Sequence, residues 1–407
     1  MSPPRPVQRT AGRIDPGLML ALGFVSMAGS LSTDVYLPAF PQIAAAFDVE
    51  ASAVQLTMTA FLVGSAAGQL VIGAFSDALG RRRTLLAALA VFTVCAYLAA
   101  AAPTLGALIT VRAVQGFAGS AGAVLGRAIV SDLADRQRAV RAFSLLWAMI
   151  ALGPAIAAPL GGWLAQTGGW RAALVGVAVL ATAMLLVASL VIPESLPAPR
   201  RHPFTLAAIG GNVGRLLHDG AFVGFAIAFG LGYGTLIVYI SSSSFIVQDI
   251  FGATPLGYSL TFSFTGLCIM SGAWLSGRVA PRVGTGRTLL IGQLMQVGAA
   301  GASGVLAISG TLTLAAYLPL MGVFAAGCGT VMSAASAIAV GRAARTAGTG
   351  SALIGFSQFA FGALASPLGG LAGTDTAVPA FLSMTVLTLL AMGAASVGRI
   401  LERRDLA

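Results

Sequence analysis

Two ionisable residues lie inside long apolar stretches of the sequence, where charge is costly. Asp34 falls in the first such stretch and Arg112 in the fourth. A charge at the centre of a bilayer costs about 2.5–3.5 kcal/mol on insertion scales, so such residues usually face a polar cavity and serve function. A carboxyl group in a low-dielectric cavity keeps its proton more readily than in water, which makes Asp34 a candidate proton carrier. Arg112 cannot deprotonate, and we expect it to stabilise the Asp34 carboxylate or to order a water path for protons.

Both residues also have a simpler interpretation. Counted from Pro16 at about 1.5 Å per residue, Asp34 lies about 27 Å along its helix, which would suit an interfacial acid beside Pro38. Arg112 could be a buried arginine that only donates hydrogen bonds to helix backbones. The second half of the chain offers no comparable acid, so any proton coupling is expected in the first half.

A turn between the second and third apolar stretches combines glycine, acid and arginine. Gly73, Asp77, Gly80, Arg81 and Arg82 occur there within ten residues. Glycine permits a tight turn, and the arginines hold one membrane surface. Asp77 is placed to reach the positive N-terminus of a facing helix, in a contact that could form in one conformation and break in another. The alternative is a basic turn that serves only to fix orientation.

The elements that position these residues follow from composition. Of 407 residues, 57% are hydrophobic and 9% are charged, whereas an ordinary soluble domain carries about 25% charged residues. This excludes a cytosolic enzyme and, despite a net charge of +10, a free nucleic-acid binder. A membrane-spanning helix needs about 20 apolar residues. Twelve segments meet that need and predict an all-α membrane protein: 17–40, 52–75, 84–102, 105–130, 140–164, 171–192, 220–245, 257–277, 288–309, 312–341, 351–373 and 378–399.

The arginines set the expected orientation. With loops assigned alternately, one side receives nearly all of them and the other essentially Arg171 alone. This is the asymmetry of the positive-inside rule, and it predicts an inner-membrane protein with both termini in the cytoplasm.

The chain is expected to divide into two six-helix bundles, residues 1–192 and 220–407, joined by a Pro- and Arg-rich cytoplasmic linker over 193–219. The halves echo each other, because the sequence from Gly277 to Gly284 follows the eighth segment as the Asp77 turn follows the second. Parallel repeats of this kind are a transporter architecture, with the binding site near the midplane between the halves.

No cofactor, metal or catalytic centre is expected. His202 and His218 fall in the linker without a nucleophile or a metal-ligand spacing. Cys95, Cys268 and Cys328 lie in apolar stretches and suit packing. The chain has no nucleotide-binding domain to drive an ATP-powered pump. We therefore expect a monomeric transporter, not an enzyme, whose partners are a small lipophilic substrate, protons and the bilayer.

The Asp77 turn resembles the signature loop of the major facilitator superfamily, roughly Gly-x-x-x-Asp-Arg-x-Gly-Arg-Arg. Ala78 replaces the usual basic residue. The sequence around Arg112, from Leu108 to Gly116, resembles the fourth-helix motif credited with a role in proton transfer. A third match, to the fifth-helix antiporter motif, comprises Gly153, Pro154, Pro159, Gly161 and Gly162. One residue separates proline from the Gly-Gly pair here, where the family has two.

Further segments resemble the Bcr/CflA drug-resistance branch of drug:proton antiporters: Thr33–Pro41, Gly68–Leu70, Tyr239–Ser241 and Ala347–Leu353. The resemblance implies rocking halves, alternating access and efflux of bicyclomycin-like, phenicol or other lipophilic compounds. A single buried acid favours one proton per substrate, and neutral or monocationic substrates. The rival interpretations are a transporter of an endogenous metabolite and, more remotely, a membrane enzyme or sensor.

Drug sites are mostly apolar with a few well-placed polar groups. Six residues of suitable type and depth are candidates for the substrate cavity, with core packing or lipid contact as the alternative role for each: Tyr36, Gln115, Tyr239, Phe262, Gln358 and Phe361.

Overall fold

The computed structural model describes residues 15–133, 136–201, 214, 216–342, 347–370 and 376–406. Within these ranges the chain is helical and contains no strand. The longer helices are α1 (Pro16–Ser26), α2 (Ala28–Asp34), α3 (Phe40–Phe47), α4 (Ala51–Leu79), α5 (Arg81–Ala100), α6 (Leu105–Leu133), α7 (Arg136–Val191), α9 (Gly220–Phe245), α10 (Pro255–Val283), α11 (Thr285–Ile308), α12 (Leu314–Arg342), α13 (Ala347–Ala365) and α14 (Val378–Leu406). Short 3-10 turns occur at η1 (Leu37–Ala39), η2 (Ala198–Arg200) and η5 (Ser366–Gly370), and a π-helical turn, η3 (Ile246–Ile250), extends α9.

The twelve predicted spans correspond to these helices. Ten helices of the described part are long and apolar enough to cross a membrane, or eleven when α1 and its continuation, bent by 46° near Met27, count as one span. The 56-residue α7 is broken by Gly169, whose backbone is not helical (φ 74°, ψ −177°), so it covers both the fifth and the sixth predicted span. The predicted fold class, an all-α membrane protein, is confirmed.

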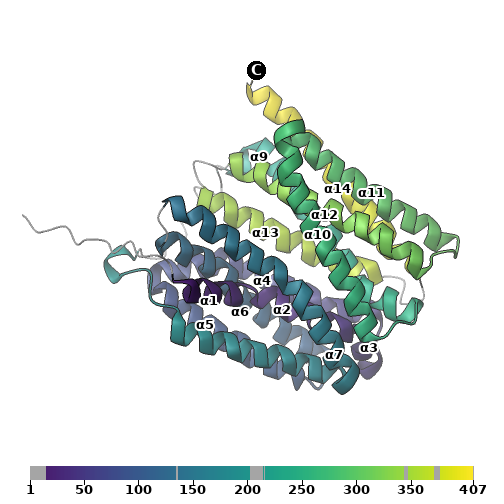
Figure 1. Ribbon diagram of the computed structural model, residues 1–407, viewed down its shortest axis with the longest axis horizontal. Helices are drawn as coiled ribbons and strands as arrows, with labels where there is room; N and C mark the ends of the chain where they lie inside the picture. Colours follow the sequence, from purple (N-terminus) through teal and green to yellow (C-terminus); the bar gives the residue numbers. More distant parts are fainter. Residues whose placement is uncertain are drawn as a thin grey trace, which may run out of the picture.

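The helices form two groups that lie side by side (Figure 1). In the first, α4 packs on α6, and α5 packs on α6 and α7. In the second, α9 packs on α14 and α13, while α10 and α11 pack on α12. The groups meet where α7 contacts α10 and α4 contacts α13. The predicted linker over 193–219 lies between them in sequence, although 202–213 and 215, including His202, fall outside the described residues.

Glycines allow close crossings between corresponding pairs of helices in the two groups. A Cβ on Gly64 of α4 would lie 1.9 Å from the carbonyl oxygen of Ala113, so only glycine lets α4 and α6 approach this closely. A Cβ on Gly272 of α10 would lie 2.0 Å from the carbonyl oxygen of Ala326, which closes the α10–α12 crossing in the same way. Small residues at such crossings are typical of membrane helices, whose backbones pack without a hydrophobic driving force between them.

The turns that follow α4 and α10 also match. Gly80 (φ 101°, ψ 149°) and Gly284 (φ 92°, ψ 141°) each cap one helix and start the next. The sequence expectation was too broad in one respect: α4 continues to Leu79, so Gly73 and Asp77 lie on the helix and Gly80 alone makes the turn. At both positions φ is in the left-handed region, which side chains with a Cβ rarely adopt.

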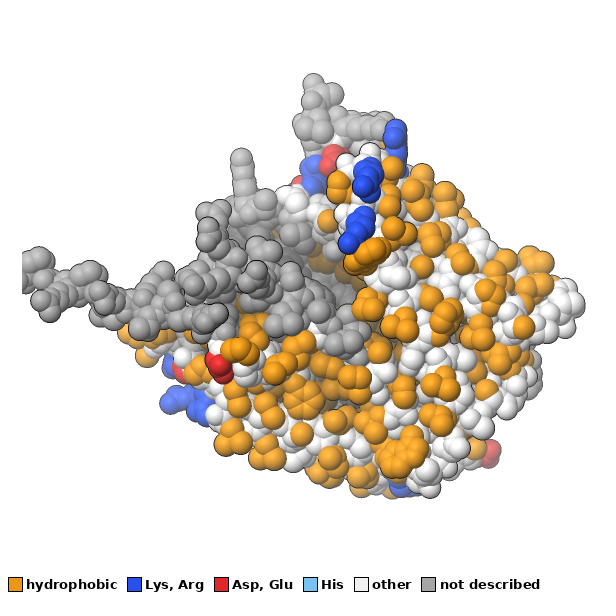
Figure 2. All heavy atoms as spheres, viewed as in Figure 1, with side chains coloured by type: hydrophobic (Ala, Val, Ile, Leu, Met, Phe, Trp, Pro, Cys, Tyr) orange, Lys and Arg blue, Asp and Glu red, His pale blue; other side chains and the backbone are white. Residues whose placement is uncertain are grey.

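The outer surface of the bundle is apolar. Figure 2 shows hydrophobic side chains spread over the visible face, with the arginine and acidic side chains at its margins. Large exposed hydrophobic residues occur on nearly every helix, among them Leu98 on α5, Leu190 on α7 and Leu364 on α13. In water such a surface would aggregate, whereas in a bilayer it meets the lipid chains.

Candidate functional site

Asp34 lies in the interior of the first group, at the end of α2. Its side chain is 5% exposed, and the hydroxyl of Thr33 donates to Oδ1 at 3.2 Å. The chain continues past it through η1 and α3 to Phe47, so Asp34 occupies the middle of a bent span. It also falls within electrostatic reach of Tyr233 on α9 and Tyr258 on α10. Asp34 therefore lies near the boundary between the groups, where the η1 turn that follows it contacts α9 and α10.

Arg112 is completely buried on α6 in a cage of polar and aromatic side chains. Its Nη1 donates to the hydroxyl of Ser32 at 2.7 Å and to Oε1 of Gln115 at 2.9 Å. The guanidinium carbon lies 4.9 Å from the ring centre of Tyr36 and 4.3 Å from that of Phe61. Cation–π contacts of this kind stabilise a desolvated cation.

The structure does not pair the two predicted proton-coupling residues. The partners of Arg112 are Ser32, Gln115 and two rings, and no ion pair joins it to Asp34 among the described residues. Its Nε and Nη2 have no hydrogen-bond acceptor there. A buried cation with unused donors is destabilising unless another arrangement supplies an acceptor. Ser32, two residues before Asp34, connects them indirectly and was not identified from the sequence.

Two of the six cavity candidates belong to the Arg112 cage. Tyr36 is fully buried and its hydroxyl lies 2.9 Å from Thr57 Oγ1, while Gln115 binds Arg112. Both side chains are therefore committed to protein partners in this conformation.

The other four candidates lie on the second group. Tyr239 hydrogen-bonds Thr265 at 2.8 Å and stacks on Phe262 with the ring planes 2° apart. Gln358 on α13 lies within hydrogen-bonding reach of Tyr233, which is also within electrostatic reach of Asp34. Phe361 packs against Gly230 of α9, where a Cβ would lie 2.4 Å from its ring. Among these four candidates, Gln358 is therefore the one connected to Asp34, through Tyr233.

The predicted gating residues form a compact ionic cluster at one end of the first group. Arg81 binds Asp77 at 2.6 Å and Asp132 of α6 at 3.1 Å, and its backbone amide donates to Glu194 at 2.9 Å. Arg82 donates to the carbonyl of Ser189 on α7 at 2.7 Å. All of these partners lie in residues 77–194, so Asp77 is engaged within its own group.

The Gly-Gly pair of the fifth-helix motif brings three elements together. A Cβ on Gly161 would lie 2.1 Å from the carbonyl oxygen of Val35, the residue after Asp34. A Cβ on Gly162 would lie 2.1 Å from the hydroxyl of Ser259 on α10. These two glycines therefore let α7 pack between the backbone just after Asp34, which we call the Asp34 corner, and α10 of the second group.

The remaining residues of this motif, Gly153, Pro154 and Pro159, precede the Gly-Gly pair on α7. Gly153 packs against Ser30 of α2, and Pro154 lies 3.9 Å from the Cβ position of Gly266 on α10. Pro159 lies inside α7, which remains helical through it.

Hydrogen bonds join the two groups at the end that carries few arginines. Ser244 on α9 donates to the carbonyl of Leu37 at 2.8 Å, and Gln248 donates to that of Pro38 at 3.0 Å. Both acceptors lie in η1, three or four residues past Asp34. The two groups are therefore joined at this end within one turn of Asp34 along the chain.

Gln55 of α4 adds two more hydrogen bonds between the groups, and together with Ser244 and Gln248 it forms what we call the polar clasp. Its side-chain amide donates to the carbonyl of Ser241 at 3.2 Å, and its backbone carbonyl accepts from the Ser366 hydroxyl at 3.3 Å. At the arginine-rich end, Arg81 pairs with Asp77 and Asp132 of the first group, and Arg342 of the second group pairs with Glu402 and with Asp219, the residue before α9.

Arg127, a half-buried cation, was not identified from the sequence. Arg127 lies on α6 toward the arginine-rich end, donates to Gln69 Oε1 at 3.3 Å and to the carbonyl of Ala123 at 3.0 Å, and has no carboxylate partner among the described residues. Because Arg127 lies near the end of the predicted span 105–130, it could be taken for a residue of the membrane surface. An arginine inside a predicted span could nevertheless have been noted from the sequence.

These observations define an integral membrane protein of the transporter class: a bundle of membrane-length helices in two groups, with the carboxyl group of Asp34 and the guanidinium group of Arg112 buried in its interior. Comparisons with known proteins agree. A family model described as Major Facilitator Superfamily matches residues 21–367. The uncharacterised MFS-type transporter YdgK of Bacillus subtilis is 33% identical over 380 residues, which cover 92% of this chain and 93% of that protein.

The chain therefore belongs to the major facilitator superfamily. The bicyclomycin resistance protein homologue of Haemophilus influenzae is 29% identical, with 92% of this chain and 94% of that protein covered, and it confirms the resemblance to the Bcr/CflA branch. Among solved structures, a bacterial homologue of the human lysosomal transporter Spinster, inward-facing and unoccupied, superposes with a TM-score of 0.73 at 14% identity, covering 96% of this chain and 98% of that chain. At that identity the likeness concerns the fold.

Proposed function

We propose that the protein exports lipophilic, neutral or monocationic drugs across the inner membrane in exchange for protons. The observation that carries this proposal is the buried carboxyl group of Asp34, which has no cationic partner among the described residues and lies near the boundary between the two groups. A carboxyl group so placed can be neutralised either by a proton or by a cationic or hydrogen-bonding substrate, and this competition is what an antiporter requires. Relatives named for bicyclomycin and chloramphenicol resistance support the substrate class.

Alternating access would be carried by the two groups of helices as rigid units, residues 1–192 and 220–407. The polar clasp joins the groups at one end, while the ion pairs named above for the described residues of the other end do not join them. We assign the arginine-rich end to the cytoplasm by the positive-inside rule, so this conformation would receive substrate from inside. The Asp77–Arg81 cluster and the Gly161–Gly162 pair lie where the groups must move relative to each other.

The test is proton flux in inside-out vesicles to which a panel of lipophilic antibiotics and dyes is added. The wild-type protein should discharge the pH gradient on addition of a substrate, and Asp34→Asn should not, although it inserts normally. Asp48→Asn is the matched control, because Asp48 is exposed with φ 52°, a conformation that asparagine tolerates. Full drug efflux by Asp34→Asn at clamped pH would refute the role of Asp34. A response to metabolites instead of drugs would favour the rival substrate class.

A further inference from the structure

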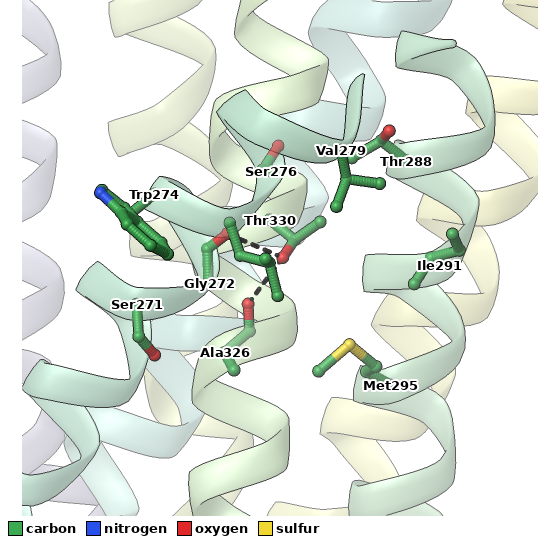
Figure 3. A pocket seen from close by; sticks show the side chains of 11 residues that line it. Ser271, Gly272, Trp274, Ser276, Val279, Thr288, Ile291, Met295, Ala326 and Thr330 are labelled. Atoms are coloured by element: carbon green, nitrogen blue, oxygen red, sulfur yellow. Dashed lines mark hydrogen bonds between the residues drawn. The ribbon is translucent and has the colours of Figure 1, made fainter. Parts of the chain in front are cut away.

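An unassigned groove lies on the outer surface of the second group, between α10, α11 and α12. It has a volume of about 220 Å³ and a largely apolar lining that includes Gly272, Leu275, Ile291, Met295 and Ala326. Figure 3 shows Val279 and Thr288 at one end, Ser271 and Met295 at the other, and Thr330 between, with its hydroxyl bound to the carbonyls of Gly272 and Ala326. The groove is therefore a narrow channel along the membrane-facing surface.

Its rim is open to the bilayer. Trp274 is 59% exposed, Leu275 54% and Ile291 45%. Gly272, where α10 and α12 approach closely, belongs to its lining.

Three exposed arginines stand at the Val279–Thr288 end. Arg278 lies with its guanidinium carbon 3.4 Å from the ring centre of Trp274, and Arg282, one turn further, donates to the carbonyl of Arg278 at 3.3 Å. Arg287 directly precedes Thr288 on α11. No carboxylate pairs with any of the three in the part of the chain that the structure describes, and residues 255–342 contain no Asp or Glu at all.

The corresponding turn of the first group carries an acid beside its arginines. Asp77 lies three residues before the turn glycine, Gly80, and pairs with Arg81. Three residues before Gly284, the second group has Pro281. The second group therefore has arginines around the same glycine turn but no acid to neutralise them, so an anion from outside the chain would complete the cluster.

We propose that this groove binds an anionic phospholipid, with one acyl chain in the channel and the phosphate at Arg278, Arg282 and Arg287. The charge complementarity selects a lipid over a neutral occupant, and the apolar channel selects a lipid over free phosphate. Basic residues at a membrane surface attract anionic lipids at close range, and a guanidinium already stacked on Trp274 is held in place for a phosphate oxygen.

The test uses Trp274 as its own reporter. In the full chain carrying W147F, W163F and W170F, the remaining tryptophan lies at the groove rim. Acyl chains brominated at mid-chain quench tryptophan on contact. Brominated phosphatidylglycerol should quench Trp274 at lower mole fraction than brominated phosphatidylcholine, and added salt should weaken that preference because it screens exposed charges.

Replacing Arg278, Arg282 and Arg287 together by glutamine should reduce the apparent affinity for phosphatidylglycerol by about tenfold or more and leave phosphatidylcholine unaffected. The matched triple lysine variant keeps the charge that also helps to orient the helices, and it should retain the preference. Ser271→Phe should fill the far end of the channel and weaken quenching by both lipids.

Equal quenching by the two lipids in the tryptophan reporter would overturn the proposal, and so would a preference that survives in the glutamine variant or disappears in a correctly inserted lysine variant. Relief of quenching by a lipophilic drug, equally in both lipids, would identify the groove as a drug port and also refute a lipid site. None of these outcomes depends on proton-coupled transport.

Discussion

The guanidinium group of Arg112 donates a hydrogen bond from Nη1 to the hydroxyl of Ser32 at 2.7 Å, and Ser32 lies two residues before Asp34. The buried cation and the buried acid of the first group thus share one element, α2, without forming an ion pair. Two of the arginine's nitrogens remain without an acceptor among the described residues. We propose that a conformational change that brings the carboxylate to these nitrogens would link the charge state of Asp34 to the shape of the bundle.

Arg112→Lys is expected to lower substrate-driven proton flux by about fivefold or more, since couplings between sites in proteins are typically about 1–3 kcal/mol. Lysine keeps the charge but cannot bind Ser32 and Gln115 together or stack between Tyr36 and Phe61. The measurement is quenching of a pH-sensitive dye in vesicles. Arg171→Lys is the matched control, because Arg171 also stacks on an aromatic ring, that of Trp170 at 4.0 Å, but is exposed. Equal losses in both variants would argue against a specific role for Arg112.

Asp77→Asn is expected to slow transport several-fold while substrate affinity stays within about twofold. Its carboxylate binds Arg81 at 2.6 Å in this conformation, and removing it changes the relative stability of the conformations more than the substrate site. Transport rate and equilibrium binding are measured on the same preparation. A normal rate at normal expression would exclude a gating role, and a parallel loss of binding would point to misfolding.

Gly161→Ala is expected to destabilise the protein by about 1–3 kcal/mol, the usual range for overpacking. Its Cβ would lie 2.1 Å from the Val35 carbonyl oxygen, and backbone atoms cannot move aside as a side chain can. Thermal unfolding in detergent, followed by fluorescence, provides the measurement. Gly301→Ala on α11 serves as the control, because a Cβ there meets nothing within 4 Å, and alanine should be neutral or slightly stabilising. A melting temperature unchanged by Gly161→Ala would contradict the close packing of α7 on the Asp34 corner.

Asp219 predicts a defined response to acid. It caps α9 by accepting from the Phe222 amide at 3.0 Å and binds Arg342 through both oxygens at 3.2 Å. Partial burial acts to raise the pKa of Asp219, but these hydrogen bonds and the Arg342 charge outweigh it and lower the pKa below the ordinary value. Because the folded-state pKa is depressed, the stabilisation is fully present above the unfolded-state value of about 3.9 and is lost as the pH falls through the folded-state value.

The measurement is the melting temperature between pH 6 and pH 3, for the wild type and Asp219→Asn. Asparagine is as good a helix cap but carries no charge, so the variant should lose a contribution of up to about 1 kcal/mol at neutral pH and converge on the wild type in acid. Parallel curves over the whole range would show that the ion pair contributes nothing.

The spans, the fold class and the family could be read from the sequence because a bilayer imposes a strong local rule: every spanning backbone must satisfy its own hydrogen bonds, so apolar segments of sufficient length become helices. The same holds for the turn at Gly80, where a positive φ demands glycine. Asp34 and Arg112 were identifiable because charge is rare in such segments.

Only the tertiary structure decided what these residues touch. The bend near Met27, the Ser32–Arg112 hydrogen bond, the clasp formed by Ser244 and the position of Arg127 all depend on how each helix is rotated and tilted against its neighbours. In a chain whose helices are apolar on every side, hydropathy has no preferred face from which to read that rotation. It is fixed instead by close crossings such as Gly64 on Ala113 and Gly161 on Val35, where the absence of one side chain lets two backbones meet.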